Sequence, residues 1–158
     1  MQKIPMTAGG KQALLDEVTH LKSVERPRIV QAISEALAQG DLRENAEYQY
    51  AKEEQGFIEG RIIEVANKLS AAQVIDVKII PPTGKVIFGV TVVLYDVDTE
   101  EEVRYHIVGD DEADISIGKL SYSAPLARGI IGKREGDEIE VKTPGGKKSY
   151  EIVEVLYI

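Results

Sequence analysis

Apolar residues recur at steps of three and four along the first half of the chain, a spacing typical of helices that pack along one seam. The first series is interrupted by Pro27, which lacks a backbone N–H, so we expect a kink near Val24. Thr7 is placed to cap this first helix. The series comprises Leu14, Val18 and Leu21 before the proline and, in shifted phase, Val30, Ile33 and Leu37 after it. The second series is continuous and comprises Ala51, Gln55, Ile58, Ile62, Val65, Leu69 and Ala72.

The stretch GDLRENAEY, residues 40–48, separates the two series and carries turn and capping signals. Gly40 suits the end of the first helix, and Asp41 with Glu44 has the spacing of a capping box at the start of the second. Each helix of about 30 residues would be ~45 Å long. Residues 1–76 are therefore predicted to form a long antiparallel helical hairpin, a coiled coil with an acidic tip at 40–48. A dimerising coiled coil, or two helices packed on a sheet, is the alternative; the turn signals and matching lengths favour the hairpin.

The pattern changes to short β-type segments beyond residue 73. Pro81-Pro82-Thr83-Gly84 marks a break, Pro125 can open a short helix, and Pro144-Gly145-Gly146 is a turn inside a closing hairpin. The predicted strands are Val74 to Val77, Val86 to Leu94, Val103 to Val108, Leu120 to Ser123, Glu138 to Thr143 and Tyr150 to Leu156. The fold class is thus α+β: the hairpin, followed at 77–158 by a compact, mostly antiparallel β domain with one short helix.

Composition and charge narrow the class of protein further. The formal net charge of −8 is opposite in sign to that of a typical duplex-DNA binder. Cysteine is absent, which excludes disulfides and thiolate metal sites. No apolar run approaches the roughly 18 residues of a membrane helix, and the N-terminus lacks the apolar stretch of a signal peptide. A cytoplasmic protein is expected.

The predicted tip is strongly acidic, because between residues 35 and 60 only Arg43 and Lys52 oppose seven carboxylates. Helix capping alone could account for Asp41 and Glu44. Their oxygens could equally bind a hard cation such as Mg²⁺, which commonly takes one or two carboxylates and keeps several waters. Two carboxylates make an incomplete site, which another molecule could complete. The second acidic run, Asp110 to Asp114, lacks the ligand spacing of a calcium loop and is predicted to be a solvated turn.

Several long runs, in order, resemble bacterial transcript cleavage factors of the GreA/GreB family. The resemblance covers essentially the whole chain, and its length and motif wording are closer to the GreA branch than to the GreB branch. The matching runs are GDLRENAEY at 40–48, Ile4 to Thr7, Gln73 to Asp76, Val108 to Asp114 and Pro125 to Gly129.

The resemblance implies a function on RNA polymerase. The hairpin would enter the polymerase's secondary channel, while the β domain, similar to the FKBP-like fold, grips the channel rim. Asp41 and Glu44 would help to hold a second Mg²⁺ and its attacking water when the nascent RNA 3′ end is backtracked. The polymerase would itself hydrolyse the RNA, so the protein is not expected to be an enzyme. The metal would be held jointly with polymerase and not stably by the isolated protein, which is expected to be a monomer.

The resemblance also implies which residues contact RNA and the channel rim, and this chain departs from the family pattern in two places. Lys52 and Arg43 are the expected RNA contacts, but position 37, basic in the family, is Leu37, so a weak grip on RNA is expected. The expected docking loop is Ser123, Ala124, Pro125 and Leu126; the family usually has a polar residue and Ser before this proline.

Three rival functions remain open. A polymerase inhibitor of the same shape would differ at the tip, and the intact run Asp41-Leu42-Arg43-Glu44 argues for the activator. An FKBP-like prolyl isomerase needs an aromatic-lined pocket, for which residues 78–158 supply only one Phe, Phe88. A bare coiled-coil adaptor predicts no role for any single tip carboxylate.

Overall fold

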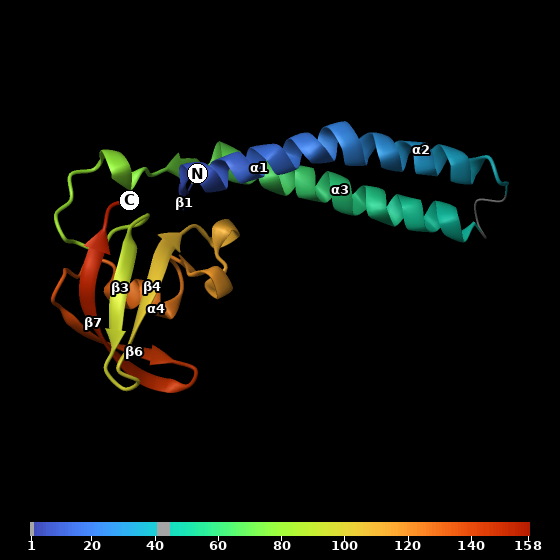
Figure 1. The fold of residues 1–158 in the computed structure, drawn as a ribbon. Helices are drawn as coiled ribbons and strands as arrows, with labels where there is room; N and C mark the ends of the chain where they lie inside the picture. Colours follow the sequence, from blue (N-terminus) through green and yellow to red (C-terminus); the bar gives the residue numbers. More distant parts are fainter. Residues whose placement is uncertain (1, 41–44) are drawn as a thin grey trace. The chain divides into compact units, whose positions relative to one another are not determined.

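The computed structural model describes residues 2–40 and 45–158 (Figure 1). The described chain forms two compact units, one of residues 11–72 and the other of residues 3–10 and 73–158. The first is helical and the second is built on a β-sheet, so the predicted α+β class is confirmed. Within the described residues, no helix is both long and apolar enough to cross a bilayer.

The helical unit is the predicted hairpin. Its first arm runs through α1 (Ala8–His20), a π-helical turn (Leu21–Glu25) and α2 (Arg26–Leu37), and its second arm is α3 (Ala46–Ser70). α2 and α3 pack side by side along the hairpin (Figure 1). Thr7 caps α1 as predicted, since its Oγ1 accepts a hydrogen bond from the Gly10 N–H at 3.1 Å.

The π-helical turn lies where a kink was predicted, and it shifts the apolar seam of the first arm. A π turn holds an extra residue compared with an α turn, so the apolar face after it lies one position later than in an uninterrupted α-helix. The buried residues of α2 are Ile29 and Ala36. Val30 and Leu37, which we predicted in the seam, are 53% and 43% exposed. That part of the prediction is wrong by one residue. On α3 the predicted seam is confirmed at its core by buried Ala51, Ile58, Ile62 and Val65.

Ion pairs flank the apolar seam and fix the register of the two arms. Arg26 donates two hydrogen bonds to the Glu59 carboxylate, at 2.7 and 2.9 Å, and Arg61 donates two to Glu17, at 2.5 and 2.7 Å. These guanidinium groups lower the pKa of Glu59 and of Glu17 from the usual range. The pairs are partly exposed, so they contribute more to register than to stability.

The second unit contains a five-stranded sheet in the order β5-β4-β3-β7-β6. Neighbouring strands are antiparallel except β4 and β5, which are parallel. The short helix α4 (Pro125–Ile130), with proline in its first turn as predicted, lies against β6. The strands are β3 (Thr91–Asp96), β4 (Glu101–Val108), β5 (Lys119–Ser121), β6 (Glu138–Thr143) and β7 (Gly146–Leu156). A separate two-stranded sheet joins β1 (Ile4–Met6) to β2 (Ala72–Val74).

Two predicted strands differ from the observed ones. The segment from Val86 belongs to the core, but β3 starts only at Thr91, because Gly89 has φ +93°, which breaks an extended strand. Val77 lies in the short 3₁₀ helix η2 (Val77–Ile79) instead of a strand. Two further 3₁₀ helices, η3 (Asp110–Glu112) and η4 (Ile115–Ile117), connect β4 to β5. The fully buried side chains of the core include Val86, Val90, Val92, Leu94, Ile107, Ile130 and Ile152.

Candidate functional site at the hairpin tip

Asn45 joins the two helices at the end of the hairpin. Its Oδ1 accepts a hydrogen bond from the Tyr48 N–H at 3.0 Å, which caps α3. Its Nδ2 donates to the backbone carbonyl of Ala36 at 2.6 Å, near the end of α2. One amide side chain therefore satisfies an otherwise unpaired donor at one helix end and an acceptor near the other. A carboxylate could serve the first role but not the second, because an ionised carboxylate only accepts hydrogen bonds.

The N-cap predicted from the sequence was therefore wrong. The described start of α3 is Ala46 with Asn45 as its cap, so Asp41 does not cap this helix and Glu44 does not occupy its third position. Asp41, Arg43 and Glu44 themselves lie outside the described residues. The structure therefore gives α3 a cap other than the one predicted. Among the described residues there is no group of three or more metal-binding side chains.

Lys52, the other expected RNA contact, is an exposed side chain on α3. Its Nζ donates a hydrogen bond to Gln55 Oε1 at 3.1 Å, one helical turn further from the tip. An exposed pair of this kind is easily broken. The ammonium group can therefore turn to an anionic partner at little cost.

The expected docking loop follows β5 and continues into the first turn of α4, and its start is held by hydroxyl groups. Ser123 Oγ donates to Asp110 Oδ1 at 2.6 Å, and Ser121 Oγ, 2.9 Å from Ser123 Oγ, is bonded to the same carboxylate. Ala124 is the cap residue of α4, Pro125 is exposed, and Leu126 packs partly against the core of the sheet. The loop thus presents Ser123 and Pro125 outward on a fixed backbone.

The acidic run after β4 is a largely exposed turn, as predicted, except at Glu112, which is partly buried and hydrogen-bonded. Glu112 accepts hydrogen bonds from the backbone N–H groups of Thr7 and Gly109, at 3.1 and 3.2 Å, and from the Thr7 hydroxyl. Asp114 caps η4 through the Ser116 N–H. Glu112 and Asn45 are the two polar residues that our sequence reasoning missed. Asn45 could have been found, because asparagine is a preferred N-cap, whereas no local signal pairs Glu112 with a residue 105 positions away.

Comparison with known proteins defines the class. A sequence model described as transcription elongation factor, N-terminal, matches residues 4–74, and one described as transcription elongation factor, GreA/GreB, C-term, matches residues 81–157. The chain therefore belongs to the GreA/GreB family of transcription elongation factors. Transcription elongation factor GreA of Pseudomonas aeruginosa is 60% identical over 158 residues, and that of Acinetobacter baumannii 56%; each match covers all of both chains. The GreA/GreB structure from Nitrosomonas europaea is 26% identical, covers 98% of this chain and all of its own, and has a TM-score of 0.43.

Proposed function

We propose that this elongation factor enters the secondary channel of RNA polymerase with its hairpin and stimulates the polymerase's own cleavage of backtracked RNA. Membership of the family supports an action on transcription elongation. The observation that carries the more specific proposal is the cap at Asn45. Asn45 caps α3 through the Tyr48 N–H, so this cap does not depend on Asp41 or Glu44. We therefore assign Asp41 and Glu44 a function in chemistry.

The donor set suits the proposed chemistry. Asp41 and Glu44 offer hard carboxylate oxygens, the ligands that Mg²⁺ prefers, and two of them leave room for water and for ligands from polymerase. When bound, the metal would activate the attacking water or stabilise the leaving oxygen, as in two-metal hydrolysis. The contribution of this chain is to hold the two carboxylates at the end of a stiff arm. The hydrolytic site belongs to polymerase, so the factor alone is not an enzyme.

The other proposed contacts are with the nascent RNA and with the rim of the channel. Lys52 and Arg43 would contact the nascent RNA 3′ end, and the exposed position of Lys52 on α3 supports this. Ser123, Ala124, Pro125 and Leu126 would form the docking loop on the channel rim, in a second unit that we expect to be similar to the FKBP-like fold. Leu126 supports the loop from inside, because it packs against the core. The factor would act as a monomer.

A cleavage assay on a stalled, backtracked elongation complex tests the proposal. The factor should shorten the RNA from its 3′ end and restore elongation, and RNA incubated with factor and Mg²⁺ alone should stay intact. Occupancy of polymerase without cleavage would identify a channel inhibitor of the same shape. Cleavage of free RNA would refute the assignment of the hydrolytic site to polymerase.

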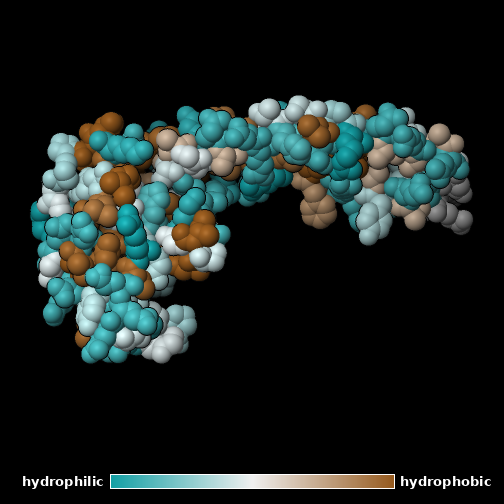
Figure 2. Space-filling model, viewed as in Figure 1, coloured by the Kyte–Doolittle hydropathy of each residue, from teal (hydrophilic) through white to brown (hydrophobic). Residues whose placement is uncertain are grey.

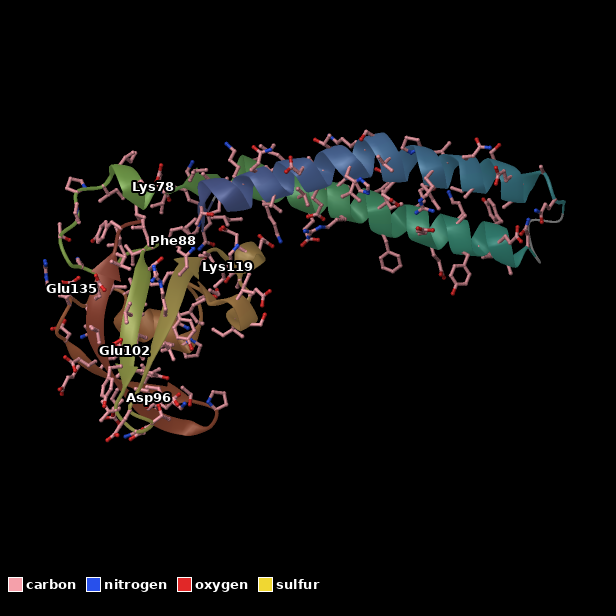
Figure 3. The ribbon with its side chains drawn as sticks, in the orientation of Figure 1. Lys78, Phe88, Asp96, Glu102, Lys119 and Glu135 are labelled. Atoms are coloured by element: carbon pink, nitrogen blue, oxygen red, sulfur yellow. The ribbon has the colours of Figure 1, made fainter. Side chains whose placement is uncertain are left out.

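A prolyl isomerase function is less well supported by the packing. Phe88, labelled in Figure 3, lies edge to face with Tyr122, with ring centroids 5.7 Å apart, and both pack against the sheet core. These two rings support the core of the unit and are therefore not free to line a substrate pocket. Turnover of a proline peptide by the purified protein would contradict this view.

A further inference from the structure

Two aromatic side chains stand exposed on α3 without a packing role in the hairpin. Tyr50 is 75% exposed and Phe57 is 79% exposed. With Ile79, they are the three most exposed large apolar side chains among the described residues. The visible surface of the hairpin is otherwise mainly hydrophilic (Figure 2). Exposed rings are costly in water, and aromatic residues are enriched where protein partners bind.

The two rings share one flank of the helix. They are seven residues apart, which places them on the same side of α3 and ~10 Å apart along its axis. Gly60, one turn beyond Phe57, would meet nothing within 4 Å if it carried a Cβ, so space lies open beside the ring. Lys52 lies two residues from Tyr50, about 200° around the helix, and therefore faces another direction. Glu53 and Glu54 lie between the two rings on this side of α3. We call these four residues, Tyr50, Glu53, Glu54 and Phe57, the aromatic flank.

The charges of the aromatic flank select its partner. Glu53 and Glu54 are three and four residues from each ring, so both carboxylates lie between the rings. Glu54 is ion-paired with Arg28 of α2, and Glu53 is exposed. A strand of RNA would bring phosphates against the exposed Glu53 carboxylate, and a second copy would bring the same carboxylate to a symmetric contact. A protein surface with an apolar cleft rimmed by Lys or Arg is complementary to the flank.

We propose that the aromatic flank is a second contact with RNA polymerase, separate from the docking loop, in which Tyr50 and Phe57 enter an apolar cleft with a basic rim. This inference rests on the proposed function, which places the hairpin inside the polymerase. The flank anchors the arm through side chains that have no part in the chemistry of the tip. Both rings are largely exposed, as this contact requires.

The test measures equilibrium binding of the full chain to core polymerase without nucleic acid and to a backtracked complex. Tyr50→Ser and Phe57→Ser should each weaken both affinities about 10-fold, and the double variant about 100-fold, as for central aromatic contacts. Cleavage at saturating factor should be unchanged. Ile63→Ser is the matched control, because Ile63 is 61% exposed on another side of α3 and should bind like the wild type. Glu53→Lys should also weaken binding, most strongly at low salt.

Each other result overturns the proposal in a recognisable way. Double-variant binding within about threefold of wild type would refute the contact while leaving the proposed function intact. Weakening confined to the complex that contains RNA would assign the rings to base stacking. A wild-type dimer in gel filtration that the double variant abolishes would assign the flank to a second copy. Failure of the wild type itself to bind polymerase would refute both this inference and the proposed function.

Discussion

Replacing Asn45 tests whether one side chain holds the hairpin tip together. Asn45→Ala removes the hydrogen bond from the Tyr48 N–H and the one to the carbonyl of Ala36. Loss of an N-cap costs about 1 kcal/mol, and loss of a partly buried hydrogen bond about 1 kcal/mol more. The tip should therefore be destabilised by about 2 kcal/mol. Asn45→Asp keeps the cap but loses the donor, so about half of this loss is expected.

Local hydrogen exchange is the suitable assay, because a chain of two units need not unfold in one step. A loss of about 2 kcal/mol should speed exchange of the amides at residues 49–52 about 30-fold in Asn45→Ala. Gln49→Ala, at an exposed position in the same turn, is the control and should leave this protection unchanged. Protection in Asn45→Ala within twofold of wild type would refute the two-sided role of Asn45.

Two further predictions concern the remaining polar contacts. Glu112→Ala should lower the stability of the second unit by about 2–4 kcal/mol, because it leaves two N–H groups and the Thr7 hydroxyl without their acceptor. Urea unfolding followed by tyrosine fluorescence measures this loss of stability. A loss below about 0.5 kcal/mol would contradict the prediction. The ion pairs lower the folded-state pKa of Glu17 and Glu59, so their stabilisation is complete above the unfolded value of 4.5 and is lost as pH falls through the folded value. The stability of the hairpin, measured from unfolding followed by far-UV circular dichroism, should therefore be insensitive to pH above about 6 and should fall below about pH 4. A stability that rises as the pH falls would contradict the pairing.

The helical hairpin could be predicted from the sequence because its signal is local and repeated. The α3 seam is an uninterrupted run of steps of three and four, and the structure buries its central residues. Two seam positions of the first arm, Val30 and Leu37, were placed one residue too late, because the sequence indicates an interruption near Pro27 but not the number of residues in the irregular turn. The π-helical turn over Leu21–Glu25 supplies that number.

The tip and the sheet show where local patterns are ambiguous. Asp41 and Glu44 have the spacing of a capping box, but Asn45 can bond to both helices at once, and this favours a helix that begins at Ala46. In the sheet, β-branched residues after Val86 predicted burial correctly and strand geometry incorrectly, since Gly89 turns the backbone before β3. Contacts between distant residues, such as Thr7 with Glu112, depend on the finished fold and leave no local pattern.

Asp41 and Glu44 are proposed to provide metal ligands to the polymerase active site. The most direct test is the rate of stimulated cleavage against Mg²⁺ concentration for wild type, Asp41→Asn and Glu44→Gln. Glu47→Gln is the control, because Glu47 is an exposed carboxylate in the first turn of α3. Melting and polymerase binding should be unchanged in all variants. Cleavage at limiting Mg²⁺ should fall roughly 100-fold in the two tip variants alone and should be partly restored as Mg²⁺ is raised. Wild-type cleavage rates in Asp41→Asn and Glu44→Gln at limiting Mg²⁺ would refute the assignment of these carboxylates as metal ligands.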